Sequence, residues 1–330
     1  MFHVSWKRQA ITQIIIHTLY WRSKTNARGA DGDALLQSVF DYLIINEKFR
    51  RLRAEALCFF SLTIYPKIMK YFISTALLVM TLVATCNAAN DYEELIANSE
   101  ARVYQGSNGA KLPYRLFKPD NYDPSKSYPL IIFLHGAGSR GTDNVKHMTN
   151  CQFLTLISGE NRVKHPAFLI APQCPAGKRW CETDWSARTA HKTPAVPSES
   201  MACLLELVDE LRKEFPLDKS RLYVLGTSMG GYGTCDFVCR RGNEVAAYVP
   251  VCGGADNEKI CQFKNAKGWF FHGDKDASVP VERSRSAVAA LKAAGCDIRY
   301  TELPGRGHNI WTEAYDTPGL AEWLFEQKLK

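Results

Sequence analysis

Several common features are missing from this 330-residue sequence, and each absence narrows the class of protein. No C-x-x-C pair occurs among its 11 cysteines, and such pairs are the usual ligands of structural zinc, so we expect no metal site. Internal repeats and low-complexity linkers are missing as well. The sequence therefore indicates one large globular domain behind an N-terminal segment.

An excess of positive charge is missing from most of the chain, although the net charge is +7. Residues 1–88 contain 11 Lys or Arg and 5 Asp or Glu, so the remaining residues are close to neutral. A near-neutral body gives no electrostatic basis for binding nucleic acid. Apolar residues make up 46% of the chain and charged residues 23%, which is enough for a hydrophobic core.

A long apolar run is missing too. Residues 71–85 are uncharged and mostly apolar, but this run is shorter than the about 20 residues that cross a bilayer. It follows Met69-Lys70 and ends in Cys86-Asn87-Ala88-Ala89, and this order of basic, apolar and small residues is typical of a secretory signal peptide. We predict a signal peptide over residues 69–88, cleavage near Ala88, and a secreted or periplasmic protein.

Residues 1–68 contain no recognisable motif, and we interpret them as a non-native or disordered extension ahead of a biological start at Met69. Two alternatives remain. The extension is genuine and residues 71–85 anchor the protein in a membrane, or the protein is a lipoprotein attached through Cys86. Without either alternative, no stable association with a membrane is expected.

Nine of the cysteines follow residue 88, so at least one thiol stays free if the others pair. Cys174 and Cys181 flank a loop and form a candidate disulfide. Cys235 and Cys239 are one helical turn apart, and we expect them to be small core residues.

From residue 101 onward, strands and helices alternate. Strands are predicted over residues 101–104, 112–118, 129–134, 168–172, 222–226, 247–251, 268–273 and 298–303, and helices over 150–158, 200–215, 230–240, 282–294 and 318–329. The first strands are close together and half-buried in pattern, as in antiparallel pairs. The later strands are continuous apolar runs between helices, which is typical of a parallel sheet covered on both faces. The fold class is therefore α/β, with about eight strands in a mostly parallel sheet and residues 89–330 as the catalytic domain.

The most informative stretch is Leu222-Tyr223-Val224-Leu225 followed by Gly226-Thr227-Ser228-Met229-Gly230. An apolar strand runs into G-x-S-x-G, and a helix follows. Such a turn exposes a serine hydroxyl above a helix N-terminus, which suits a nucleophile and a developing oxyanion. Gly226 and Gly230 stand where a side chain would clash in a turn this tight. By itself, G-x-S-x-G occurs by chance, so its weight depends on the partners that a nucleophile needs.

Those partners follow in the order acid, then histidine, each after a predicted strand. Asp276 follows the apolar strand that ends at Gly273, and Asp274 in the same loop is the alternative acid. His308 lies between Gly307 and Asn309 after the last strand, and we predict it to be the general base. Either aspartate is also a residue type that merely caps a turn.

Two other histidines compete with His308 for the role of base, His135 and His272. His272 lies at the end of a predicted strand and is better explained as a buried, hydrogen-bonded histidine. His135 opens the sequence His135-Gly136-Ala137-Gly138, in which small residues leave backbone N–H groups free to face a carbonyl oxygen. We predict the N–H groups of Ala137 and Met229 to form the oxyanion hole.

Together, these four motifs resemble those of the α/β-hydrolase superfamily. Within it, residues 101–330 are similar to the secreted polyhydroxybutyrate-depolymerase and feruloyl-esterase-like group and to the catalytic domain of prolyl-oligopeptidase-family proteins. The resemblance implies an α/β-hydrolase fold, a catalytic triad of Ser228, Asp276 and His308, and no cofactor. No β-propeller and no large lid insertion is apparent in the sequence, which weakens the peptidase and lipase interpretations.

Substrate-binding residues are harder to predict. The candidates are Arg140, Asp143 and Asn144 after the oxyanion loop, Trp185 in the loop that follows Cys174, and Trp311 after the base. Aromatic rings suit stacking on a sugar or a phenolic ring. Each tryptophan is equally well explained as a packing residue.

We therefore predict a secreted serine carboxylesterase that acts through an acyl-enzyme. Its partner would be a small-molecule or polysaccharide-linked ester, such as acetyl or feruloyl groups on plant polysaccharide, or a short polyester. Two alternatives remain, a serine peptidase of the prolyl-oligopeptidase type and a catalytically inactive binding protein with the same fold.

Overall fold

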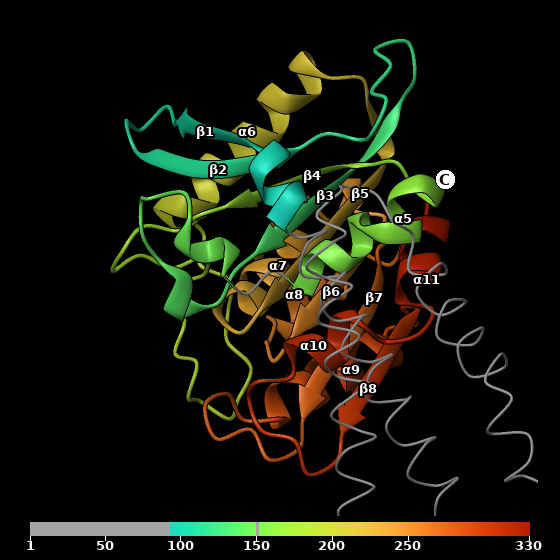
Figure 1. Cartoon of the computed structure of the whole chain (residues 1–330). Coiled ribbons are helices and arrows are strands. Elements are labelled where there is room, and N and C mark those ends of the chain that lie inside the picture. Colours follow the sequence, from blue (N-terminus) through green and yellow to red (C-terminus); the bar gives the residue numbers. More distant parts are fainter. Residues whose placement is uncertain (1–92, 150–151) are drawn as a thin grey trace, which may run out of the picture. The chain divides into compact units, whose positions relative to one another are not determined.

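Strands and helices alternate along residues 93–149 and 152–330, the residues that the computed structural model describes (Figure 1). The proposed extension and signal peptide lie outside them. The strands are β1 (Glu100–Gln105), β2 (Lys111–Phe117), β3 (Tyr128–Leu134), β4 (Phe168–Pro172), β5 (Leu217–Thr227), β6 (Ala247–Val251), β7 (Lys267–Gly273) and β8 (Ile298–Leu303). The α-helices are α5 (Gly159–Lys164), α6 (Glu199–Glu214), α7 (Met229–Arg241), α8 (Asn257–Ile260), α9 (Glu282–Ala293), α10 (Trp311–Tyr315) and α11 (Leu320–Glu326).

All eight strands join one sheet in the order β1-β2-β4-β3-β5-β6-β7-β8. The pairs β1–β2 and β2–β4 are antiparallel, and every pair from β4–β3 to β7–β8 is parallel. The half-buried pattern of the first strands and the continuous apolar runs of the later ones therefore predicted the strand directions correctly. The α/β class with about eight strands is confirmed.

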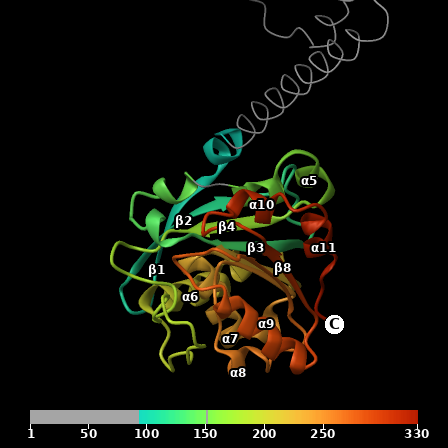
Figure 2. The ribbon, with the colours of Figure 1, turned by 90° about the horizontal axis from the view of Figure 1, so that it is seen from below.

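Helices cover both faces of the sheet (Figure 2). Helices α6, α7, α8 and α9 lie on one face, and α5, α10 and α11 lie on the other. Each face has its own core, because side chains along a strand alternate between the two sides. On β3, Leu130, Ile132 and Leu134 enter the core beneath α6 and α7, whereas Ile131 and Phe133 enter the core beneath α10 and α11.

The predicted helix over residues 150–158 is wrong in type. Its described part is the 3-10 helix η3 (Gln152–Ile157), and α5 follows as a separate helix. Three further 3-10 turns, η1 (Ala137–Ser139), η2 (Lys146–Met148) and η4 (Gly242–Glu244), and the short helices α8 and α10 were not predicted. Elements this short contain no full period of an apolar pattern, so the sequence carries little signal for them.

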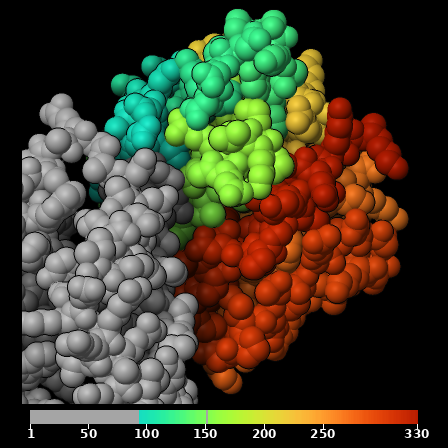
Figure 3. Space-filling model, turned by 45° about the vertical axis from the view of Figure 1, so that its right-hand side comes forward, coloured from blue at the N-terminus to red at the C-terminus, as the bar shows by residue number. Residues whose placement is uncertain are grey.

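One face of the molecule joins η3 and α5 to the C-terminal helices, and Figure 3 shows these green and red segments in contact. The Thr155 hydroxyl contacts Asp316 Oδ1 at 3.0 Å. The ring of His165 stacks on Phe325 with centroids 4.5 Å apart. The first contact holds the end of α10, which carries one wall of the site, against η3, and the second holds the end of α5 against α11. Among the described residues, no helix is long and apolar enough to cross a membrane.

The candidate disulfide between Cys174 and Cys181 is not formed, because both thiols are free. The Cys174 thiol lies 3.3 Å from the hydroxyl of Ser200, and the Cys181 thiol faces His191. Cys235 and Cys239 are free and buried in α7, as expected of small core residues.

Candidate active site

Ser228 stands at a sharp turn between β5 and α7. Its backbone has φ 56° and ψ −117°, a conformation that non-glycine residues rarely adopt and that costs strain energy. The glycines two residues before and two residues after Ser228 have no room for a side chain. A Cβ on Gly226 would clash with the Gly230 carbonyl, and a Cβ on Gly230 would clash with the Leu134 carbonyl. The predicted role of these two glycines is thus confirmed in steric terms.

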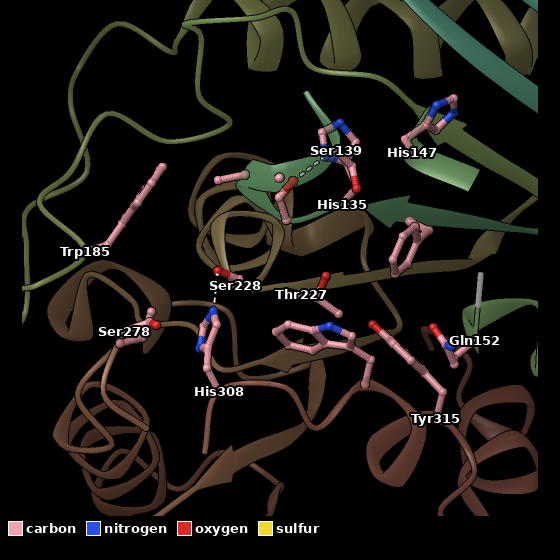
Figure 4. A pocket seen from close by; sticks show the side chains of 16 residues that line it. His135, Ser139, His147, Gln152, Trp185, Thr227, Ser228, Ser278, His308 and Tyr315 are labelled. Atoms are coloured by element: carbon pink, nitrogen blue, oxygen red, sulfur yellow. Dashed lines mark hydrogen bonds between the residues drawn. The ribbon is translucent and has the colours of Figure 1, made fainter. Parts of the chain in front are cut away.

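The imidazole of His308 lies between the predicted nucleophile and the predicted acid, and Figure 4 shows its contact with Ser228. Its Nε2 is 2.9 Å from Ser228 Oγ, and its Nδ1 is 2.6 Å from Asp276 Oδ2. A carboxylate accepts only, so Nδ1 carries the proton and Nε2 is left to accept the serine proton. The three residues come from the C-terminal ends of β5, β7 and β8, which meet at one edge of the sheet.

The carboxylate of Asp276 is fully buried at its side chain and is held from both oxygens. Oδ1 accepts from the N–H groups of Ser278 and Val279, at 2.8 and 2.9 Å. Burial alone would raise the pKa of this carboxyl, but hydrogen bonds from His272, His308 and the Val279 N–H hold its pKa well below the usual range. Asp276 therefore stays ionised and can stabilise a cationic His308.

The alternative acid, Asp274, has a different contact. Its Oδ1 accepts from the Gly305 N–H at 2.6 Å, so it ties the β7–α9 loop to the loop that carries His308. Asp274 thus joins two loops, whereas the turn-capping contacts that the sequence left open are made by Asp276, to the Ser278 and Val279 N–H groups.

Both predicted oxyanion donors are the first residue of a helical turn, Ala137 in η1 and Met229 in α7. The first N–H groups of a helix have no acceptor within it. The loop before Ala137 is held from behind, because Trp180 Nε1 donates to the His135 carbonyl at 3.1 Å and Cys174 N donates to His135 Nε2 at 2.9 Å. The two N–H groups are therefore placed on fixed backbone.

The competing histidines are both buried and bonded elsewhere. Burial lowers the pKa of His135 to about 3, and its Nε2 accepts from Cys174 N, so it is a neutral structural group. His272 lies behind Asp276. Its Nε2 is 3.0 Å from the Val279 carbonyl and 3.2 Å from Asp276 Oδ2, and since both are acceptors, Nε2 must carry a proton.

Cys252, His272 and Asp276 place three possible ligand atoms within 4.8 Å of one another. All three atoms are already engaged. Burial raises the pKa of the Cys252 thiol far above its usual range, and the other two hydrogen bond to each other. A thiol must lose its proton to bind a metal, so this cluster is better suited to supporting the triad.

A pocket of about 380 Å³ opens beside Ser228, and Figure 4 shows its lining. Trp185 and Trp311 both line it, as expected, and the ring of Trp311 meets His308 edge-on with centroids 5.2 Å apart. The sequence did not single out His147, Gln152 and Tyr315, which also line the pocket. They come from η2, η3 and α10, three short elements that had no signal of their own.

Three polar residues expected to contact substrate do not line the pocket. The Arg140 Nε donates to the Ala137 carbonyl at 2.9 Å, so the side chain braces the oxyanion loop instead. Asn144 is 8% exposed, and its Nδ2 donates to the carbonyls of Arg102 and Tyr114, which turns it inward. The third polar candidate, Asp143, caps the turn into η2 through the N–H groups of Val145 and Lys146.

The strand order, the serine turn and the three converging side chains define an α/β-hydrolase-fold protein. Comparisons with known proteins agree. Residues 107–235 match the family described as putative esterase. The chain is 24% identical to a bifunctional acetylxylan esterase/xylanase of Neocallimastix patriciarum and 27% identical to a probable feruloyl esterase C of Aspergillus niger. These alignments cover 62% and 60% of this chain, and 32% and 67% of the relatives, so the chain spans about a third of the length of the first.

Among solved structures, a thermostable esterase is 34% identical, with a TM-score of 0.65, over 71% of this chain and 64% of that one. The resemblance seen in the sequence is thus confirmed: the chain has the α/β-hydrolase fold and is similar to esterases, feruloyl esterases among them.

Proposed function

We propose that the protein is a serine carboxylesterase that hydrolyses carboxylic esters through an acyl-enzyme. The observation that carries the proposal is the continuous contact from Ser228 Oγ through His308 to Asp276, at 2.9 and 2.6 Å. Groups within hydrogen-bond reach in this order are what serine acyl transfer requires. The matched esterase family and the esterase relatives support ester bonds as the target.

In this mechanism Ser228 Oγ attacks the ester carbonyl carbon while His308 Nε2 takes the serine proton. Asp276 holds the imidazole tautomer and stabilises its positive charge. The N–H groups of Ala137 and Met229 face the oxygen that becomes negative. His308 then gives its proton to the departing alcohol, and a water molecule, activated by the same imidazole, releases the acid and restores Ser228.

We infer that the natural substrate is an acetyl or feruloyl ester on plant polysaccharide, or a short polyester. The Neocallimastix relative is named for acetylxylan and the Aspergillus relative for feruloyl esters, which supports a polysaccharide-linked substrate. The pocket accepts a group larger than acetyl, since its volume is about 380 Å³.

The deciding experiment compares Ser228→Ala with the unchanged protein on nitrophenyl acetate, acetylxylan and methyl ferulate. We expect Ser228→Ala to lower kcat by at least about 10³-fold while the protein stays folded. The matched control is Ser286→Ala, a helix serine outside the pocket whose hydroxyl donates to the Arg283 carbonyl. This control should keep full activity and should still react with a fluorophosphonate probe.

The same assays test the two alternatives. Strong cleavage of proline-peptide anilides with weak ester turnover would favour the peptidase. Failure of the fluorophosphonate probe to label Ser228 would favour an inactive binding protein and would overturn the esterase proposal.

We also propose that the protein is exported, on the evidence of the signal-like residues 69–88. N-terminal sequencing of the protein recovered outside the cell tests this. A mature chain that begins close to Ala89 supports cleavage, whereas one that begins before Met69 contradicts it. Lipid attached to Cys86 would show the lipoprotein alternative to be correct.

A further inference from the structure

A long irregular segment forms the wall of the pocket that carries Trp185. Residues 173–198, between β4 and α6, contain no helix or strand. Loops of this length without regular structure are uncommon in compact domains, and those that occur usually have a function. Trp185 lines the pocket from this segment, and Figure 4 shows it on the opposite side of Ser228 from Tyr315. The position of the indole ring therefore depends on the contacts that hold the segment in place.

One of these contacts comes from a buried guanidinium group, that of Arg283 near the start of α9. The residue is 1% exposed. Its Nη2 donates to His191 Nδ1 at 2.6 Å, and its Nε donates to the Tyr232 hydroxyl at 3.1 Å. The guanidinium carbon also lies 5.1 Å from the centre of the Tyr232 ring. Arg283 thus contacts the segment through His191 and helix α7 through Tyr232.

A second hydrogen bond continues from Tyr232 to the backbone of Trp185. The Tyr232 hydroxyl donates to the Trp185 carbonyl oxygen at 3.3 Å. Tyr232 is fully buried, and burial raises the pKa of its phenol to about 12, so the hydroxyl keeps the proton that it donates. Because the same oxygen accepts from Arg283 Nε, two hydrogen bonds in series join the guanidinium to the residue that carries the indole.

His191 is the residue of the segment that Arg283 holds directly. A guanidinium group only donates, so His191 Nδ1 accepts and Nε2 carries the proton. Burial and the charge of Arg283 lower the pKa of His191 to about 4, so the ring is neutral and can accept at neutral pH. Its Nε2 lies 3.6 Å from Cys181 Sγ, in the same segment. The imidazole therefore joins the guanidinium to two places in the segment.

Arg283 has no carboxylate partner, unlike two other arginines close to it in the fold. Arg240 pairs with Asp236 at 2.7 Å, and Arg241 pairs with Asp209 at 2.6 Å. Within the described residues, Arg283 forms no ion pair, and its Nη1 has no hydrogen-bond partner. A buried charge without a counter-charge costs free energy and is weak evidence for a role in stability. Stability is often lost in this way where a residue serves an active site.

Building on the proposed esterase function, we propose that Arg283 is a positioning residue for the substrate pocket. It holds Trp185 through Tyr232 and the surrounding segment through His191, and it does not line the pocket itself. Trp185 then contacts the larger portion of a bound ester, whereas an acetyl group is too small to depend on it. Arg283 therefore affects the KM of esters with a large bound portion, and it does not affect the chemical step at Ser228.

The variant Arg283→Met removes the charge and both hydrogen bonds while filling most of the same space. We expect KM for methyl ferulate to rise about ten-fold with kcat nearly unchanged, and both constants for nitrophenyl acetate to stay the same. The melting temperature should not fall, because the variant removes a buried charge that has no counter-charge. The matched control is Arg241→Met, whose guanidinium pairs with Asp209 outside the pocket, and it should keep both KM values.

A double-mutant cycle tests whether Arg283 acts through Trp185. Trp185→Ala should raise KM for methyl ferulate by at least as much as Arg283→Met does. Adding Arg283→Met to Trp185→Ala should then raise KM little further, because the indole that Arg283 positions is already absent. Two effects that simply multiply would overturn the link, and so would an unchanged KM in Trp185→Ala. A KM that rises equally for both esters, in step with a falling melting temperature, would show that Arg283 acts only through stability.

Limited proteolysis with trypsin tests the hold on the segment without any ester. Arg188 and Lys192 are exposed cleavage sites within it. Well below the melting temperature, Arg283→Met should be cut at these sites about ten-fold faster than the unchanged protein and Arg241→Met, because the segment opens locally more often. Equal cleavage rates for all three proteins would overturn the role of Arg283 and leave the esterase proposal standing. If no ester is hydrolysed, the esterase proposal fails, and these cleavage rates still decide whether Arg283 holds the segment.

Discussion

Two residues hold Asp276 Oδ2, and only one of them, His308, is part of the triad. The other is His272, which is fully buried and contacts Asp276 Oδ2 at 3.2 Å while bonding the Val279 carbonyl at 3.0 Å. Its Nδ1 is 2.7 Å from the hydroxyl of Ser284 in α9. His272 thereby joins the acid to the strand before it and the helix after it, which makes it a positioning residue.

We predict that His272→Leu lowers kcat by about ten-fold or more and leaves KM nearly unchanged, since a small displacement of Asp276 misaligns His308. His272→Gln should restore most of kcat, because its amide can still donate toward Asp276. Steady-state kinetics on nitrophenyl acetate provide the measurement. Equal losses for both variants, in step with their melting temperatures, would mean that His272 acts only through stability.

At the residue scale, the sequence predicts the positions that local steric constraints determine. It does not predict the orientation of a side chain that can face either the backbone or the pocket. Ser228, Gly226 and Gly230 follow from one tight turn, so their arrangement was predictable. Arg140 and Asn144 follow the oxyanion loop in sequence but fold back onto backbone carbonyls. Nothing in the local sequence distinguishes that orientation from one that faces a substrate.

The turn between β5 and α7 is the element on which the site depends most. At Gly230 a Cβ would meet the carbonyl groups of Leu134 and His135, which belong to the neighbouring strand β3 and its loop. Because these are backbone atoms of the central sheet, they cannot move aside as a flexible side chain could. The turn and the oxyanion loop are thus packed against each other without spare volume.

We predict that Gly230→Ala abolishes activity and lowers the melting temperature by several degrees or prevents folding, because overpacking against backbone costs at least 1–3 kcal/mol. Gly138→Ala is the matched steric control. It lies in the same oxyanion loop, but an added Cβ there has no atom within 4 Å. Thermal unfolding of both variants is the measurement, and a normal melting temperature for Gly230→Ala would contradict the packing argument.

The boundaries of helices and strands were predictable where an apolar pattern extends over many residues, and they were not predictable in elements of only a few residues. The strands follow from runs such as Leu222–Leu225, and α6 follows from apolar positions on one face. By contrast, η2, η3 and α10 span 3, 6 and 5 residues, and their positions are set by packing against the sheet rather than by their own sequences. These three elements supply His147, Gln152 and Tyr315 to the pocket, so that part of its lining could not be predicted from the sequence.

At the scale of the whole molecule, two buried histidines couple stability to pH. Burial lowers the pKa of His135 to about 3 and that of His147 to about 4, against about 6.5 in an unfolded chain. Between pH 6.5 and 4 the unfolded chain therefore binds protons that the folded protein does not. The free energy of unfolding must fall as the pH is lowered through this range.

We predict a loss of up to about 3 kcal/mol per histidine between pH 6.5 and 4, at about 1.4 kcal/mol per pH unit. Urea unfolding at several pH values measures it. His147→Gln, whose amide can still donate to the Ala171 carbonyl, should show a shallower dependence than the unchanged protein. An identical slope in this variant would contradict a buried, neutral His147.

The triad also sets when activity appears as the chain folds. Ser228 precedes β6, β7 and β8, whereas Asp276 and His308 follow the last two strands of the sheet. A nascent or refolding chain can therefore present its serine turn early and yet remain inert until β8 has paired with β7. When the protein refolds after dilution from denaturant, the return of hydrolysis therefore reports the pairing of β8 with β7. A folding intermediate in which β8 is still unpaired has no activity, so a turnover assay does not detect it.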